Sequence, residues 1–170
     1  MLFENKKELD NIMNRFNNDI EGLQAQKNKE RTEQEEFIKE FERLKHEIIW
    51  PVIADVGNQM NEYKHDFHVS EEEEYVDATA NFQPASITLN IYPATLDKAS
   101  YKPECTPYIS FIANRYAKKI GIMVSTMMPA EGGVIGSHGE YTLDQVTKEF
   151  VEKEIVEVLK NTLFLHNTKE

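Results

Sequence analysis

"YISFIANRYAKKIGIMVSTMM", residues 108–128, contains two apolar segments that are separated by only three residues, Ala117–Lys119. Each segment has apolar side chains at neighbouring as well as alternate positions, which is typical of a strand that is buried on both faces. A turn at Ala117–Lys119 would make the two segments neighbours in an antiparallel sheet. Residues 108–128 therefore predict the central hairpin of a sheet.

Three segments before this hairpin alternate between apolar and polar residues, as half-exposed strands do. The first contains Phe67 and Val69, the second spans residues 76–82, and in the third Ile87, Leu89 and Ile91 alternate with polar neighbours. With the central hairpin they predict an antiparallel meander of four to five strands.

Helical periodicity flanks the predicted sheet on both sides. Apolar residues recur every three or four positions from Phe37 to Tyr63 and pass through Pro51 in phase, which predicts a kinked helix. The alternative is a new helix with Pro51 at its first position. Thr142 followed by Gln145 predicts a capping box and the start of a closing amphipathic helix. Helices at both ends of a meander indicate an α+β fold, with the C-terminal helix covering one sheet face.

The first 36 residues differ from the rest of the chain. Leu2, Leu9, Phe16 and Leu23 lie seven apart, with Ile12, Met13 and Ile20 between them, whereas residues 24–36 have only Ala25 as an apolar residue. The first part predicts an amphipathic helix, and the second is either a solvated helix or a flexible join. We therefore predict a helical arm at 1–36, for which a coiled coil is one candidate form, and an α+β domain at 37–170. Alternatively, residues 24–36 form the bend of a helical hairpin, and the apolar residues belong to the core.

The composition narrows the classes of partner. The chain has 170 residues, a formal net charge of -11 and a single cysteine. Excess negative charge disfavours binding to nucleic acid or anionic lipid, and one cysteine provides neither a disulfide nor a zinc ribbon. No apolar run is long enough to span a bilayer, so we predict a cytoplasmic protein without membrane contact. No cofactor or metal is predicted.

Four of the seven glycines lie in "PAEGGVIGSHGEYTLDQ", residues 129–145. A phosphate-binding P-loop requires a lysine after its last glycine, and here Glu140 places a negative charge there instead. We predict a mobile loop. The alternative is a loop that binds a small ligand through Gly133, Gly136, Ser137 and His138.

Two further clusters raise catalytic and metal-binding hypotheses. His138 and Glu140 would share one face if they lay in a strand, and could act as acid and base, with Ser137 and Asp144 nearby. In "HDFHVSEEEE", residues 65–74, His65 and His68 would point to opposite faces of a strand, so a structural interpretation is preferred to a metal site. Neither cluster identifies an enzyme, and the prediction leans against one.

Protein binding is the function that these observations favour. Tyr92, Tyr108 and Tyr116 are predicted on the sheet face opposite Ile87, Leu89 and Ile91, where their rings could contact a partner. We predict a non-catalytic, adaptor- or chaperone-like module that binds a protein and self-associates, with a dimer favoured. A small-ligand sensor at residues 132–139 is the alternative, and an acid–base enzyme comes third. The helix-flanked sheet resembles the cytosolic chaperones of bacterial secretion effectors only at the level of fold, and no family is assigned.

Overall fold

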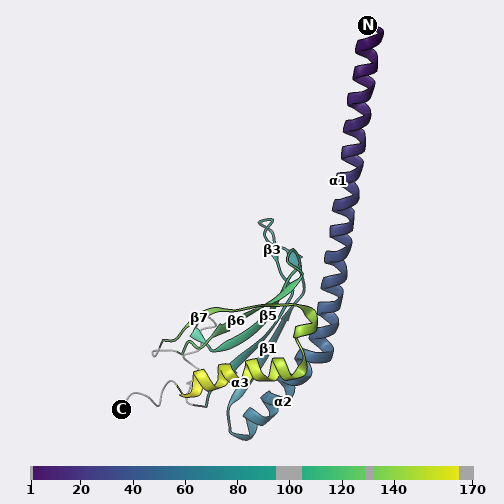
Figure 1. The fold of residues 1–170 in the computed structure, drawn as a ribbon. Coiled ribbons are helices and arrows are strands. Elements are labelled where there is room, and N and C mark those ends of the chain that lie inside the picture. Colours follow the sequence, from purple (N-terminus) through teal and green to yellow (C-terminus); the bar gives the residue numbers. More distant parts are fainter. Residues whose placement is uncertain (1, 95–104, 129–131, 165–170) are drawn as a thin grey trace. The chain divides into compact units, whose positions relative to one another are not determined.

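The computed structural model describes residues 2–94, 105–128 and 132–164 (Figure 1). The chain divides into two compact units, Met1–Glu36 and Phe37–Glu170. The second unit contains the sheet and the helices packed on it, and its architecture is the predicted α+β class.

Helix α1 spans Phe3–Leu44 without interruption. The polar segment 24–36 is therefore helical, and a hairpin bend at that place is not observed. Three exposed ion pairs support this segment and the turns after it. Arg31 Nε lies 3.1 Å from Glu35 Oε1, and the Arg43 guanidinium lies 2.9 Å from Glu40 and 2.7 Å from Glu47. Such pairs one turn apart stabilise a helix that has no apolar face in that segment.

The helical path continues through a π-helical turn, η1 (Lys45–Ile49), into α2 (Trp50–Glu62). Pro51 lies in the first turn of α2, and because the helical path is continuous there, its missing backbone N–H leaves one helical hydrogen bond unmade. The helical path does not stop at Pro51, and α2 begins one residue before it, at Trp50, so Pro51 is not the first residue of a new helix. Widened π turns and prolines are the usual causes of kinks in long helices.

The main sheet has five antiparallel strands in the order β1-β4-β5-β6-β7. They are β1 (Asp66–Glu72), β4 (Ser86–Tyr92), β5 (Tyr108–Asn114), β6 (Lys119–Ser125) and β7 (Ile135–Tyr141). The central hairpin is confirmed as β5 and β6, with Ile109 opposite Val124 and Phe111 opposite Ile122. Its turn occupies residues 115–118, and Lys118 has a positive φ of 51°.

The core lies between one face of this sheet and the helices α2 and α3 (Lys148–Phe164) (Figure 1). Ile87, Leu89 and Ile91 of β4 are fully buried, as are Ile109 and Phe111 of β5. The helices contribute Phe41, Ile49, Ile53, Ile155 and Val158, all fully buried. Helix α2 lies so close to β1 that a Cβ atom at Gly57 would overlap the Phe67 ring. Burial of this apolar surface is the main stabilisation of the second unit.

Three local predictions are wrong. Residues 76–82 do not form one strand but a small hairpin of β2 (Tyr75–Val76) and β3 (Phe82–Gln83), because Asp77 Oδ1 accepts bonds from Thr79 and Asn81 and closes a turn. The predicted Thr142–Gln145 capping box is present, but the predicted helix start is wrong: the box starts a 3₁₀ turn, η4 (Leu143–Gln145), and α3 begins six residues after Thr142. Residues 135–141 are strand β7 and not a loop, because they pair with β6.

Candidate functional site

The first candidate surface is the apolar stripe of the arm, which we define as Leu2, Leu9, Ile12, Met13, Phe16, Ile20 and Leu23. Six of these seven side chains are exposed, by fractions between 41% for Leu9 and 75% for Leu2, and Ile20 is partly buried. Large apolar side chains gathered in one contiguous stripe are unusual on a solvated surface and mark association sites. The arm stripe is the largest set of exposed apolar side chains among the described residues.

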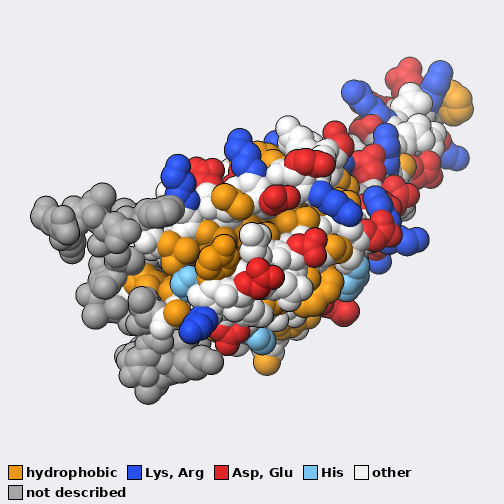
Figure 2. All heavy atoms as spheres, turned by 90° about the horizontal axis from the view of Figure 1, so that it is seen from below, with side chains coloured by type: hydrophobic (Ala, Val, Ile, Leu, Met, Phe, Trp, Pro, Cys, Tyr) orange, Lys and Arg blue, Asp and Glu red, His pale blue; other side chains and the backbone are white. Residues whose placement is uncertain are grey.

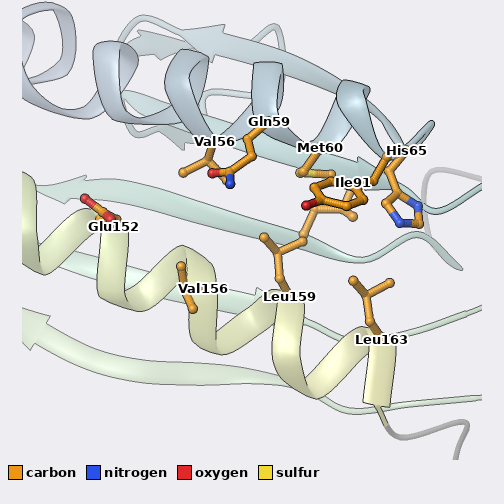
Figure 3. Close-up of a pocket in the computed structure, with 10 residues that line it drawn as sticks. Val56, Gln59, Met60, His65, Ile91, Glu152, Val156, Leu159 and Leu163 are labelled. Atoms are coloured by element: carbon orange, nitrogen blue, oxygen red, sulfur yellow. The ribbon is translucent and has the colours of Figure 1, made fainter.

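The second candidate surface is a groove between α2 and α3, with a volume of about 320 Å³. Ile91 of β4 forms its floor, Val56 and Met60 line it from α2, and Val156 and Leu159 line it from α3 (Figure 3). The polar side chains at its margin are those of Gln59, His65 and Glu152. Figure 2 shows the corresponding face, where apolar side chains lie among acidic ones. The groove can accommodate an apolar group.

The third candidate surface is the sheet face opposite the helices. A hollow there, of about 400 Å³, is lined by Thr88, Asn90, Tyr108, Ser110, Ile112 and Met123. Thr88 and Ser110 share a hydrogen bond of 2.7 Å across β4 and β5, so these hydroxyls hold each other in place. The hollow is mixed in polarity, as the non-obligate contact surfaces of proteins are.

The three predicted partner-binding tyrosines occupy different places. Tyr108 lines the hollow and pairs with Asn90, whereas Tyr92 lies at the end of β4, opposite Asp66. Partial burial and the nearby Asp66 carboxylate raise the pKa of Tyr92, so its hydroxyl stays protonated at neutral pH. Tyr116 is in the β5–β6 turn, 71% exposed, and its ring packs edge-to-face on the Phe82 ring, with 6.2 Å between the ring centroids. Of these three tyrosines, only Tyr92 and Tyr108 are therefore residues of the sheet.

The glycine-rich stretch has a structural role in the described part of the chain. Gly136, Ser137 and His138 lie in β7, and Gly133 precedes that strand. A Cβ atom at Gly133, whose φ is 155°, would clash with the backbone of Thr126. Thr126 and Val134 exchange hydrogen bonds beside it, at 2.9 and 3.1 Å. Glycine permits this close approach of two backbones, so its presence needs no ligand as an explanation.

His138 and Glu140 do not come together, although both lie in β7. The β6–β7 register shifts between Gly121 and Met123, so a β-bulge at residues 138–139 changes which side chains share a face. His138 Nδ1 lies 3.7 Å from Glu154 Oε2 of α3, while Glu140 faces the other side and accepts a bond from Asn114 Nδ2 at 3.5 Å. The hypothesis that they share one face as an acid–base pair is wrong.

Lys45 is a buried charged residue that sequence reasoning missed. Its side chain is 2% exposed, and its Nζ lies 3.1 Å from Glu42 Oε1 and 3.3 Å from the carbonyl oxygen of Glu72. The ammonium group also lies 5.6 Å from the centre of the Phe41 ring. Lys45 stands four residues after Phe41 and four before Ile49, in phase with buried residues, and that spacing was the available signal. Through its hydrogen bond to Glu72, Lys45 links η1 to the last residue of β1.

Other kinds of site are absent from the residues that the structure describes. No group of three or more His, Cys, Asp or Glu side chains is arranged to hold a metal ion, and His65 instead accepts a bond from the Ala94 backbone at 3.0 Å. No described helix has both the length and the apolar character needed to cross a membrane. Comparison with known proteins finds no matching family model, curated protein or solved structure.

Proposed function

We propose that this is a non-catalytic, cytoplasmic protein-binding module, of the adaptor or chaperone type, which self-associates through its helical arm. The observation that carries the proposal is the exposure of the arm stripe. Isolated helices are marginally stable in water, so a helix of this length gains most of its stability by burying an apolar face. A second copy of the chain offers the same stripe, which makes a homodimer the simplest way to bury it.

The experiment that tests self-association is a measurement of the mass of the full-length chain in solution as its concentration is varied. Association through the arm predicts a mass that rises from 19.8 kDa towards twice that value. A mass independent of concentration at the monomer value would contradict the proposal.

The proposed partner surface is the sheet face around Tyr108. Tyrosine suits such a surface because it buries a large ring and keeps a polar group for hydrogen bonding. Replacing Tyr108 by alanine should weaken partner binding by about 1 to 2 kcal/mol, or roughly ten-fold, without changing the melting temperature. The measurement is the amount of partner recovered with the tagged full-length protein from its native cells, and Tyr75→Ala, in the separate β2–β3 sheet, is the control.

Equal recovery with alanine at each of Tyr92, Tyr108 and Tyr116 would remove this face as the binding surface. A large fall in melting temperature would instead assign the substituted tyrosine to the core.

A small-ligand sensor is the second candidate, and the α2–α3 groove favours it. The groove volume of about 320 Å³ is at the lower end of the range for small-molecule sites, and most of its lining side chains are apolar. In this version the ligand is a small apolar molecule held by Ile91, Met60 and Leu159. Residues 132–139 carry no part of it, because most of them form the edge strand β7.

A further inference from the structure

The heptad spacing of the arm defines two columns of side chains along one face of α1, in unit Met1–Glu36. One column holds Leu2, Leu9, Phe16, Leu23 and then Glu30. The other holds Lys6, Met13, Ile20, Lys27 and then Gln34. These are the d and a positions of a heptad repeat, which face the partner helix in a coiled coil. Three charged residues, Lys6, Lys27 and Glu30, therefore stand at positions where a partner would meet them.

A parallel dimer in register places each of these charges against its own copy. Lys6 would face Lys6, Lys27 would face Lys27, and Glu30 would face Glu30. Like charges in contact across an interface are unfavourable, and their separation from water increases the cost. The charged positions thus oppose a parallel arrangement, even though its apolar layers would pair each apolar side chain with its own copy.

An antiparallel arrangement pairs a positions with d positions, and one register matches the charges. When Ile20 faces Phe16 of the second copy, Met13 faces Leu23 and Lys6 faces Glu30. The two-fold axis repeats every one of these contacts. Among the described residues, neither the Lys6 ammonium nor the Glu30 carboxylate has an ion-pair partner within its own chain. Both are exposed and available to a second copy.

We propose that two copies of the chain pair as an antiparallel coiled coil through residues 2–34, with Lys6 of each copy opposite Glu30 of the other. This proposal rests on the proposed self-association and adds its direction and register. The paired segment of 33 residues would be about 50 Å long at 1.5 Å per residue. The Lys6–Glu30 layers, one near each end of the paired segment, fix this register, because no other alignment brings Lys6 and Glu30 together.

The same register brings two unfavourable contacts. Lys27 faces Leu9 of the second copy, so its ammonium group adjoins an apolar layer. The second contact, at Asp19, makes the register recognisable. Asp19 occupies a g position, and in an antiparallel pair g faces g, so the two Asp19 carboxylates lie beside the two-fold axis. Replacing Asp19 by asparagine removes this repulsion. In a parallel pair Asp19 would instead lie beside Gln24, and the substitution would have no such effect.

The test is a charge exchange in the full-length chain at low salt, where such pairs are least screened. Lys6→Glu and Glu30→Lys should each raise the dimer dissociation constant about ten-fold, because each creates two like-charge contacts. The double variant should return to within about three-fold of the unmodified chain, and Asp19→Asn should bind about three-fold more tightly. The matched control is Lys7→Glu with Glu21→Lys, both on the outer face of the helix, which should change nothing.

The outcomes separate the register from self-association itself. If the unmodified chain is monomeric, the proposed function fails. If the chain is dimeric but both single exchanges leave the dissociation constant unchanged, or the double variant stays as weak as the single ones, the antiparallel register is wrong while self-association stands.

Discussion

Replacing Phe16 by aspartate should raise the dissociation constant of the dimer by at least about 100-fold. Phe16 lies at the middle of the arm stripe and is 59% exposed in the single chain. In the dimer, each copy would lose a buried aromatic ring and place a carboxylate among apolar side chains, and an unpaired charge there is costly. Because both copies carry the change, its cost in binding free energy is incurred twice in each dimer. The measurement is sedimentation velocity over a range of protein concentrations.

The control for Phe16→Asp is Asn18→Asp, which adds the same charge on the opposite face of α1 and should leave association unchanged. The melting temperature of the second unit should be the same in both variants, since residues 2–23 are not part of its core. If Phe16→Asp lowered that melting temperature substantially, the stripe would belong to the core of its own chain, and the arm proposal would be lost.

Replacing Lys45 by alanine should lower the free energy of unfolding by about 2 to 4 kcal/mol. The substitution removes a buried aliphatic stem and leaves a cavity beside Phe41. It also removes the partner of the Glu72 carbonyl oxygen and of the Glu42 carboxylate, which lie 3.3 and 3.1 Å from Nζ. Glu42 is 32% exposed, so water compensates part of its loss. Urea unfolding followed by circular dichroism gives the change.

Two further variants separate the contributions at Lys45. Lys45→Met keeps most of the stem and removes only the charged group, so it should cost about half as much as alanine. Lys39→Ala, on the exposed side of the same helix, should leave the unfolding midpoint unchanged. A change of less than about 0.5 kcal/mol for Lys45→Ala would mean that the side chain is not buried as described.

The elements with strong apolar periodicity could be predicted from the sequence. The central hairpin, the alternating strand Ser86–Tyr92 and the helices on each side follow from spacing, because a buried face requires apolar residues at that spacing. Strand β7 could not be predicted in this way. Four of its residues before Tyr141 are exposed and two are glycines, so it forms only because the backbone of β6 is there to pair with it.

The candidate sites were less accessible to sequence reasoning than the fold. The arm stripe can be recognised as a heptad pattern, because all of its residues lie in one helix. The α2–α3 groove is formed by residues of α2, β4 and α3, which are far apart in sequence, and no local spacing indicates that they meet. The separation of His138 from Glu140 depends on a bulge in the β6–β7 ladder, which strand alternation alone does not reveal.

The most direct test of the central claim is sedimentation equilibrium of the unmodified full-length chain at micromolar concentrations. Association through the arm predicts a monomer–dimer equilibrium, in which the mass reaches twice 19.8 kDa and the deletion of residues 2–36 abolishes the rise. A single species at the monomer mass over the whole range, or a dimer that survives the deletion, would contradict association through the arm.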